Sequence, residues 1–216
     1  MNMKETLHQQ RVIVICRRLY GDQLFKLSQA LHEGGLDLME VTFDQSDPDC
    51  IEKTSNAISS LKQRFGDHMH FGAGTVLTEE QVISARQAGA RYIISPGFDA
   101  AVVTKTKQEG LLSIPGAMTP SEIMAAWNCG ADYVKLFPAA SLGLSYIKDI
   151  LAPISHVPLV ATAGVKEENF GDFLKLGFAG AGISGRLADK TCIAAGDYAE
   201  ITRRAKAFCA IARGGD

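Results

Sequence analysis

The sequence predicts an α/β protein: a single (β/α)8 barrel, or TIM barrel, with a short N-terminal helix, occupying residues 1–216. Two observations predict this fold: the alternation of strand-like and helix-like segments, and the length of the chain. Short apolar segments rich in β-branched residues alternate with longer segments of helical periodicity, and the alternation occurs eight times along the chain. Such alternation is typical of a parallel sheet with right-handed crossovers, and 216 residues are enough for eight compact units.

The expected strands are short and end at glycine, proline or small polar residues. The first, Val12-Ile-Val-Ile-Cys16, is a run of β-branched residues, which is typical of a strand that is covered on both faces. The eight expected strands are Val12–Cys16, Leu36–Phe43, His70–Val76, Tyr92–Pro96, Leu111–Pro115, Ala131–Pro138, Pro158–Ala163 and Gly180–Ser184.

The expected helices follow the usual start and stop signals. Thr78 with Gln81, and Thr119 with Glu122, form the pattern of a capping box. Pro48 stands where proline is favoured, at the first position of a helix. The expected helices extend over Met1–Gln10, from Asp22 to Gly34, from Asp47 to Phe65, from Thr78 to Gly89, from the fourth strand to Gly110, from Thr119 to Gly130, around Ser145–Leu151, over Lys166–Leu176 and over Asp197–Ala212.

A doubly wound open sheet is the alternative fold. It normally has fewer strands for this length and carries a glycine-rich phosphate-binding turn after the first strand. The segment in that position, Cys16–Gly21, lacks the required pattern of glycines. The sequence therefore favours the barrel.

Composition excludes several kinds of partner. The chain carries 22 basic and 24 acidic residues, a net charge of −2, and no basic block, so nucleic acid is not expected. No apolar run approaches the length of a membrane span, and the polar segment Met1–Arg11 lacks the apolar core of a signal peptide. The five cysteines are scattered without metal-ligand or redox spacing, as expected of reduced thiols in a cytoplasmic protein.

His68 and His70 have the i, i+2 spacing at which one strand face presents two metal ligands. They lie at the start of the expected third strand, away from the end of a barrel where catalysis occurs. Two surface histidines are the simpler interpretation. We expect no metal and no other cofactor.

The expected strand around Lys135 carries the residue of greatest chemical interest. Its apolar neighbours Tyr133, Val134, Leu136 and Phe137 indicate that the lysine stem and its amine are buried. Loss of hydration favours the neutral amine and lowers its pKa. A neutral amine is a nucleophile that forms a Schiff base with a ketone. The alternative is a side chain that reaches solvent at the sheet edge.

Glu40 lies near the end of the expected second strand. Period-two alternation places Leu38, Glu40 and Thr42 on one face, opposite a wholly apolar face that suits the helix layer. Glu40 is therefore expected to point into the mouth of the barrel. A buried carboxylate needs a partner or a function. The alternative is a structural salt bridge to Arg17 or Lys135.

The other strand ends are rich in small residues, which leave the backbone accessible to a ligand. Thr75 offers a hydroxyl after the third strand, whereas Pro96 could simply terminate the fourth. The turns Thr162–Gly164 and Ile183–Gly185 follow strands seven and eight, where such barrels commonly bind phosphate through backbone N–H groups. Arg17, at the end of the first strand, could supply a positive charge to the same anion.

Five motifs in order resemble those of one family: Leu38–Thr42, Gly72–Val76, Ile94–Gly97, Ile114–Gly116 and Val134–Pro138. The chain resembles the 2-keto-3-deoxy-6-phosphogluconate and 4-hydroxy-2-oxoglutarate aldolases from about Arg11 to Leu187. The resemblance implies a class I mechanism, with Lys135 as the Schiff-base lysine and Glu40 as the proton-transfer residue. It also implies that Thr75 and Pro96 line the pyruvyl pocket and that the protein is a homotrimer.

Three positions depart from the pattern of that family. Asp44 stands where the family often has an arginine that contacts substrate anions, so a favourable contact is lost and a repulsive charge is added. The turns Thr162–Gly164 and Ile183–Gly185 differ from the common Thr-Gly-Gly and Gly-Gly-Ser or Gly-Ser. The sequence therefore leaves the preference for a phosphorylated substrate open.

We expect an aldehyde-lyase that reversibly cleaves 2-keto-3-deoxy-6-phosphogluconate, 4-hydroxy-2-oxoglutarate or both to pyruvate and an aldehyde, glyceraldehyde 3-phosphate or glyoxylate. Its expected partner is this small 2-keto acid, with no nucleic acid and no membrane. Two alternatives stay open: a phosphosugar isomerase or epimerase, which would have no use for Lys135, and a non-catalytic sugar-acid binding protein. The expected site comprises Lys135 and Glu40 as catalytic residues, Arg17, Thr75, Pro96, Phe137 and Thr162 as substrate-binding residues, and Ala163, Gly164, Ser184 and Gly185 as phosphate-binding residues.

Overall fold

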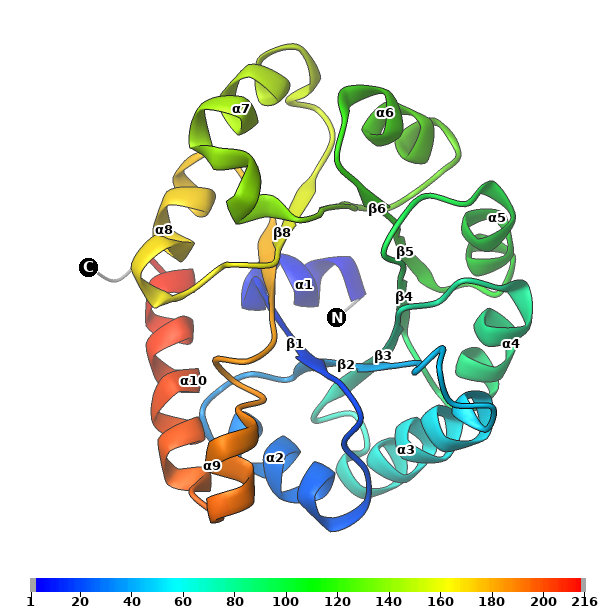
Figure 1. Cartoon of the computed structure of the whole chain (residues 1–216), viewed down its shortest axis with the longest axis vertical. Helices are drawn as coiled ribbons and strands as arrows, with labels where there is room; N and C mark the ends of the chain where they lie inside the picture. The colour runs from blue at the N-terminus through cyan, green and yellow to red at the C-terminus, as the bar shows by residue number, and fades with distance from the viewer. Residues whose placement is uncertain (1–2, 215–216) are drawn as a thin grey trace.

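The strands of the computed structural model, which describes residues 3–214, form a nearly closed parallel barrel with helices around it (Figure 1). The strand order is β5-β4-β3-β2-β1-β9-β8-β7-β6, and the paired neighbours are parallel. The predicted barrel is thereby confirmed. The predicted domain also includes residues 1, 2, 215 and 216, which lie outside the described residues.

β1 has the predicted bounds, and the other strands that match a predicted segment are shorter than it. The exception is β6, which lies outside the predicted segments, directly after the fifth of them ends at Pro115. The observed strands are β1 Val12–Cys16, β2 Leu38–Thr42, β3 His70–Gly74, β4 Tyr92–Ile94, β5 Leu112–Ile114, β6 Gly116–Ala117, β7 Val134–Leu136, β8 Leu159–Thr162 and β9 Gly180–Ile183.

β5 and β6 together occupy one position in the wall of the barrel. β5 pairs with β4, and β6 pairs with β7 through Gly116 opposite Lys135. Between them, Pro115 has no N–H to donate, but its carbonyl accepts a hydrogen bond of 2.9 Å from the Lys135 N–H. The nine labelled strands therefore correspond to the eight predicted strands of a (β/α)8 barrel.

Each predicted helix has a counterpart in the structure, with two differences. α7 is longer than predicted and is interrupted at Gly143, whose φ of 76° and ψ of 153° are not helical. The short helix α9 was not predicted, because six residues are too few to show a helical period. The observed helices are α1 Met3–Gln10, α2 Gly21–Glu33, α3 Cys50–Phe65, α4 Glu79–Gln87, α5 Ala100–Gln108, α6 Pro120–Asn128, α7 Ala139–Ile154, α8 Glu167–Lys175, α9 Lys190–Ala195 and α10 Tyr198–Ala212.

The capping box of α6 is confirmed. The Thr119 hydroxyl accepts from the Glu122 N–H, and the Glu122 carboxylate accepts from the Thr119 N–H at 2.8 Å. At α4 only half of the predicted box forms: the Thr78 hydroxyl accepts from the Gln81 N–H at 3.2 Å, but the Gln81 side chain accepts from the N–H of Leu77 instead.

Two predicted helix starts are wrong. α2 begins one residue earlier than Asp22, after Tyr20, and has no side-chain cap. α3 begins at Cys50, so that Pro48 lies in the preceding turn. That turn is held by the Asp47 carboxylate, which accepts a hydrogen bond of 3.0 Å from the Asp49 N–H. A local side-chain bond of this kind competes with helix initiation.

Apolar side chains fill both faces of the barrel wall. Along β2, Met39 and Val41 belong to the outer layer between strands and helices, whereas Leu38 belongs to the barrel interior. The predicted alternation is therefore correct, and it places Glu40 on the interior face. The interior cluster consists of Leu7, Ile13, Leu38, Tyr92, Ile94, Leu112, Ile114, Tyr133 and Val160.

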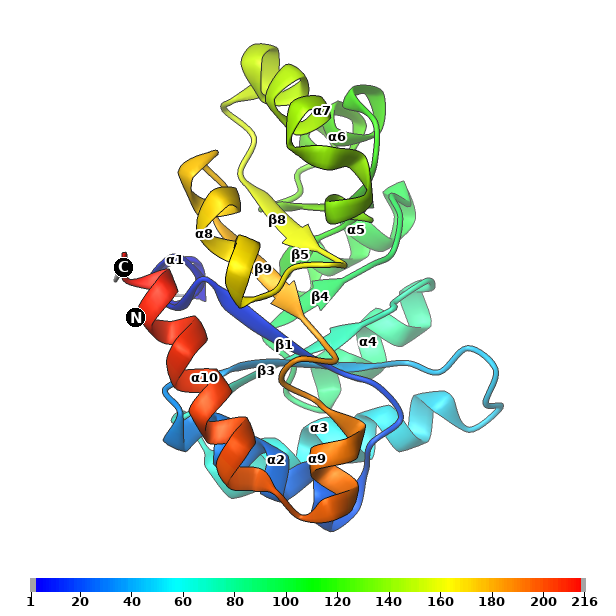
Figure 2. The same cartoon turned by 60° about the vertical axis from the view of Figure 1, so that its left-hand side comes forward.

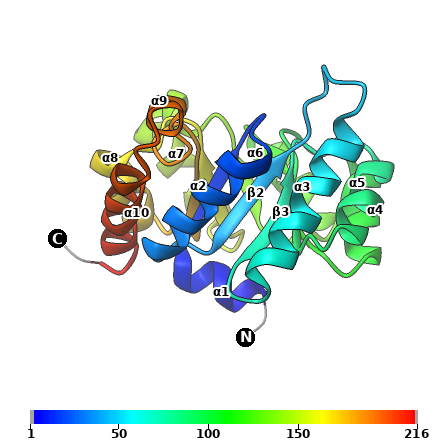
Figure 3. The ribbon, with the colours of Figure 1, turned by 90° about the horizontal axis from the view of Figure 1, so that it is seen from below.

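α1 closes the end of the barrel at which the strands begin (Figure 3). Its Leu7 packs into the interior cluster, the Lys4 amine forms a salt bridge of 2.7 Å to Asp132, and the Lys4 carbonyl accepts from the Tyr133 hydroxyl at 3.4 Å. Figure 2 shows the strand arrows pointing away from α1. The opposite, carboxyl end of the strands is therefore the open mouth of the barrel.

The first prediction concerns the cap of α6. Replacing Thr119 with alanine removes the acceptor for the Glu122 N–H, so the free energy of unfolding should fall by about 1 kcal/mol. Urea denaturation measures the change. Ser121→Ala, on the exposed first turn of the same helix, is the control and should change it by less than about 0.5 kcal/mol. Equal midpoints for the two variants would show that the cap contributes nothing.

Candidate active site

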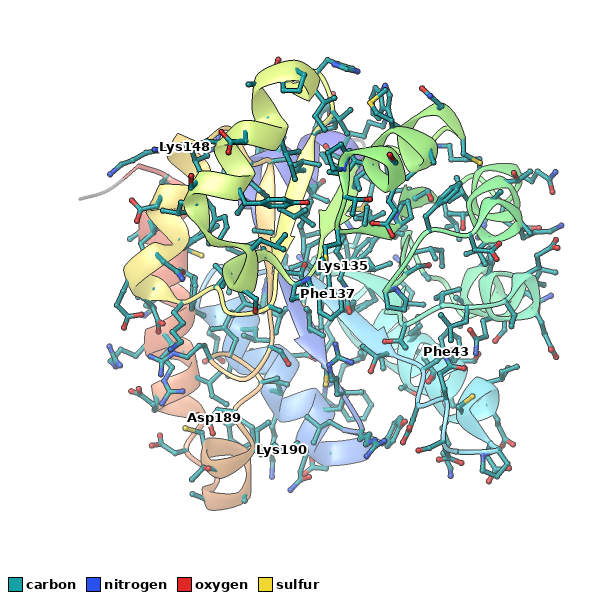
Figure 4. The ribbon with its side chains drawn as sticks, turned by 45° about the horizontal axis from the view of Figure 1, so that its top comes forward. Phe43, Lys135, Phe137, Lys148, Asp189 and Lys190 are labelled. Atoms are coloured by element: carbon teal, nitrogen blue, oxygen red, sulfur yellow. The ribbon has the colours of Figure 1, made fainter. Side chains whose placement is uncertain are left out.

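Lys135 lies in the middle of β7, and only 4% of the residue is exposed. Its strand neighbours are Gly116 on β6 and Val160 on β8, which bring no polar group to it. The Lys135 amine lies 4.9 Å from the centre of the Phe137 ring, and Figure 4 shows the two side chains together at the centre of the barrel. The alternative of a lysine that reaches solvent at a sheet edge is therefore wrong.

Glu40, on β2, is 1% exposed and points into the barrel. Its carboxylate lies over Gly74 of β3, where a Cβ atom would be 2.3 Å from Glu40 Oε1. A glycine at that position is required if the carboxylate is to occupy this space. In the described part of the chain Glu40 forms no salt bridge to Lys135 or Arg17, and its Oε2 atom has no hydrogen-bond partner. The alternative interpretation of Glu40, a structural salt bridge to Arg17 or Lys135, is therefore not supported by these contacts.

Burial favours the neutral form of both groups, because it lowers the pKa of Lys135 and raises the pKa of Glu40. Desolvation lowers the pKa of Lys135, the negative charge of Glu40 opposes that change, and the positive charge of Arg17 adds to it. Desolvation also raises the pKa of Glu40, while the charges of Lys135 and Arg17 act in the opposite direction. A neutral amine beside a group that can exchange a proton is an arrangement suited to nucleophilic attack on a carbonyl.

Two predicted residues at the strand ends have unusual backbone conformations. Thr75 has a φ of 56° and Ala163 a φ of 75°, and residues other than glycine rarely adopt such values. The carbonyl of Thr75 is held by a hydrogen bond of 2.7 Å from the side chain of Gln45, a residue that the sequence did not single out. Strain of this kind persists only where surrounding contacts fix it, and it is common at functional sites.

The predicted anion-binding turns surround one cavity of about 300 Å3. A second cavity of about 440 Å3 adjoins it, and Arg17, Ser184 and Gly185 line both. Lys135, Glu40, Thr75 and Pro96 line neither cavity. The predicted residues that line the first cavity are Arg17, Phe137, Thr162, Ala163, Gly164, Ser184 and Gly185.

Asp44 has a partner that the sequence did not reveal. Arg18 contacts it through Nε to Oδ2 at 2.7 Å and through a hydrogen bond from Nη2 to Oδ1 at 2.9 Å. A hydrogen bond from Ser46, followed by Arg18, lowers the pKa of Asp44. The repulsive charge expected at this position is therefore offset by a cation from the loop after β1. The two loops meet only in the folded chain, so no spacing pattern in the sequence could predict this ion pair.

Other cationic residues missed by the sequence also line the cavities. Arg186 and Lys166 line the 300 Å3 cavity, and Lys190 lines its neighbour. Arg186 is bonded to the Glu167 carboxylate at 2.9 and 3.0 Å, so its charge is already paired. Arg17 remains the cation common to both cavities, as its predicted role requires.

Within residues 3–214, no group of three or more histidine, cysteine, aspartate or glutamate side chains is placed to hold a metal ion. His70 begins β3 at the end of the barrel that α1 closes. In the same part of the chain, no helix has the length and apolar character to cross a bilayer.

The comparison with family models and the relatives of known name agree on one family. The family model for KDPG and KHG aldolase matches residues 3–204. A 2-dehydro-3-deoxy-phosphogluconate aldolase of Treponema pallidum (strain Nichols) is 34% identical over 92% of this chain and 91% of its own length.

Two solved structures extend this similarity. A KDPG aldolase from Legionella pneumophila, with pyruvate captured at low pH as a covalent carbinolamine intermediate, is 27% identical with a TM-score of 0.84, covering 96% of this chain and 98% of that chain. A cube-shaped, highly porous cage designed by fusing symmetric oligomeric domains is 28% identical with a TM-score of 0.83, covering 95% of this chain and 73% of that chain.

The second prediction concerns the electrostatics of Lys135. Glu40→Gln removes the negative charge that opposes the effect of burial, so the pKa of Lys135 should fall further. NMR titration of protein labelled with 15N at the lysine amine measures it, with the Lys135 signal assigned by its loss in Lys135→Met. An unchanged or higher pKa in the Gln variant would contradict the coupling between the two groups.

Proposed function

Because the chain belongs to the KDPG and KHG aldolase family, we propose that Lys135 forms the Schiff base through which this enzyme cleaves its substrate. The proposed substrates are 2-keto-3-deoxy-6-phosphogluconate and 4-hydroxy-2-oxoglutarate. Each yields pyruvate, together with glyceraldehyde 3-phosphate or glyoxylate. The observation that carries the proposal is the buried amine of Lys135, whose pKa is lowered by desolvation at the centre of the barrel.

The reaction begins when the neutral Lys135 amine attacks the C2 carbonyl of the 2-keto acid. The carbonyl oxygen takes up a proton to give a carbinolamine, which loses water to form a protonated imine. The C3–C4 bond then breaks as the C4 hydroxyl loses its proton, and the electron pair flows into the imine to give an enamine. The aldehyde departs, C3 takes up a proton, and hydrolysis of the imine releases pyruvate and the amine.

Glu40 is proposed to carry the protons in these steps. Its buried carboxylate is near enough to Lys135 for each charge to affect the pKa of the other. Burial raises the pKa of Glu40 towards neutrality, where a group exchanges protons most efficiently in both directions. An isomerase or epimerase could use Glu40 as a base, but it would give no function to a buried amine whose pKa is lowered.

The remaining predicted residues are proposed to bind the substrate. Thr75 and Pro96 would border the pyruvyl group, and Phe137, which packs beside the amine, would exclude water from it. The turns Thr162–Gly164 and Ser184–Gly185, with Arg17, would hold the distal anion in the 300 Å3 cavity. No metal or other cofactor takes part in this mechanism.

We also propose that the chain is a cytoplasmic protein that assembles as a homotrimer. Four large apolar side chains are exposed on the described surface, as an interface between copies would require: Leu77, Ile83, Met118 and Leu144. The designed cage of symmetric oligomeric domains, which shares this fold, supports an oligomer. The five cysteines are free thiols, which suits a reducing compartment.

The experiment that tests the Schiff base is trapping with borohydride. Reduction in the presence of pyruvate should attach one adduct to the peptide that contains Lys135. Lys135→Met keeps most of the length of the side chain and replaces the amine with an apolar end, so it should fold, form no adduct and lose turnover by on the order of 10⁴-fold or more. Mass spectrometry locates the adduct, and release of pyruvate measures turnover.

Lys148→Met is the matched control. Lys148 lies on α7 at the periphery of the molecule (Figure 4) and is exposed, so this variant should keep both the adduct and the turnover. An adduct on another lysine, or an active Lys135→Met enzyme, would disprove the mechanism at this position.

The anion site is tested at Gly185. A Cβ atom built there meets no described atom within 4 Å apart from its chain neighbours, so Gly185→Val should fold, and Gly185 lines the anion cavity, so the added side chain stands at its border. Gly164 is a poorer choice, because its φ is 75° and a Cβ atom would lie 2.4 Å from Ala140. Inorganic phosphate should inhibit the unchanged enzyme competitively against the phosphorylated substrate.

In Gly185→Val, inhibition by phosphate should weaken and KM for the phosphorylated acid should rise by roughly tenfold or more. A change of this size corresponds to the loss of one or two charge-assisted hydrogen bonds to the phosphate. 4-Hydroxy-2-oxoglutarate supplies the internal comparison: its distal anion is a carboxylate attached directly to C4, which reaches less far than the phosphate, so its KM should rise less. Equal inhibition of the two proteins by phosphate would show that this cavity does not bind the anion.

A further inference from the structure

Tyr92 is a tyrosine buried completely in the interior of the barrel, at the start of β4. Its hydroxyl has no hydrogen-bond partner among residues 3–214. A buried hydroxyl without a partner loses its hydration without compensation, whereas phenylalanine would fill the same space without that loss. The presence of this hydroxyl therefore calls for a functional explanation.

The ring of Tyr92 lies across β3 towards β2. A Cβ atom added to Gly72 of β3 would be 2.2 to 2.7 Å from the Tyr92 atoms Cε2, Cδ2 and Cζ. Gly72 is paired directly with Glu40 of β2. β2, β3 and β4 are consecutive strands of the wall (Figure 1), so the tyrosine ring covers the glycine that separates it from Glu40.

Glu40 presents a matching polar atom to the same interior. Its Oε2 atom is buried and, like the Tyr92 hydroxyl, has no partner in the described chain. The two atoms are thus not bonded to each other directly. The charge of Glu40 nevertheless raises the pKa of Tyr92 further above the value that desolvation alone would give. Two unpartnered polar atoms that face the same buried interior from either side of one strand are the setting in which an internal water is bound.

We propose that Tyr92 is a positioning residue for Glu40, and that its hydroxyl holds one buried water which donates a hydrogen bond to Glu40 Oε2. This inference rests on the proposed function, in which Glu40 carries the protons. The water fixes the carboxylate from below, on the side of the barrel interior. Glu40 Oε1, which lies over Gly74 nearer the mouth, stays free to exchange protons with substrate.

The hydrogen bond has a defined effect on titration, because it stabilises the charged carboxylate more than the neutral acid. The ionisable groups that act on Glu40 or respond to it come from four elements: Lys135 from β7, Arg17 from the loop after β1, Cys16 from β1 and Tyr92 from β4. Lys135 and Arg17 also favour the charged form, whereas the Cys16 thiol, whose pKa is raised to about 12, stays neutral. Removing the Tyr92 hydroxyl leaves these other contributions in place.

The test is Tyr92→Phe, measured by exchange of the pyruvate methyl protons in D2O, which follows enamine formation by NMR. Below the pH at which Glu40 is half ionised, the exchange rate should fall by roughly tenfold, and the acidic limb of the pH profile should move to higher pH. Borohydride trapping of pyruvate on Lys135 and KM for pyruvate should be unchanged, because the amine and the substrate contacts are untouched.

Tyr133→Phe is the control. Tyr133 belongs to the same interior cluster, but its hydroxyl donates to the Lys4 carbonyl at the closed end of the barrel, so its pH profile should match that of the unchanged enzyme. If Tyr92→Phe also keeps the unchanged profile while trapping on Lys135 is intact, the inference is overturned and Tyr92 only fills space. Failure to trap pyruvate on Lys135 in the unchanged enzyme would instead overturn the proposed function, and this inference with it.

Discussion

The burial of one amine is the constraint on which the rest of this structure depends. A charged lysine residue that is only 4% exposed loses most of its hydration, a penalty that real proteins relieve by lowering the pKa or by supplying a partner. Here the relief is partial: Glu40 lies close enough to favour the charged form but forms no salt bridge with it in the described chain. A full ion pair would stabilise the ammonium and remove the nucleophile.

Keeping a carboxylate and an amine inside a barrel requires space that most strands do not offer. β3 supplies it through Gly72 and Gly74, over which the Tyr92 ring and the Glu40 carboxylate respectively lie. A Cβ atom at Gly72 would overlap the buried Tyr92 ring, and one at Gly74 would displace the Glu40 carboxylate from the position it now occupies. The glycine-rich strand is thus a packing requirement of the polar groups beside it, and its backbone is not simply a flexible segment.

The sequence predicts the barrel, its strands and the two central side chains because each depends on a local pattern. Period-two alternation is enough to place Glu40 inside, and the apolar neighbours of Lys135 are enough to bury it. The break at Pro115 and the salt bridge between Arg18 and Asp44 depend instead on segments that meet only after folding. The same reason hides Tyr92, since nothing in its sequence neighbourhood shows that Gly72 leaves room for its ring.

Two of the arginines at the mouth are paired with carboxylates. Arg18 is bonded to Asp44 and Arg186 to Glu167, and each pair carries no net charge towards a substrate. Arg17, which also contributes to the electrostatics of Lys135 and Glu40, forms no such pair in the described chain and lines both cavities. In the proposed reaction, an anion bound at Arg17 would partly neutralise the guanidinium, weaken its lowering of the Lys135 pKa and so return some positive charge to the amine. In that reaction a single side chain would couple substrate binding to the reactivity of the amine.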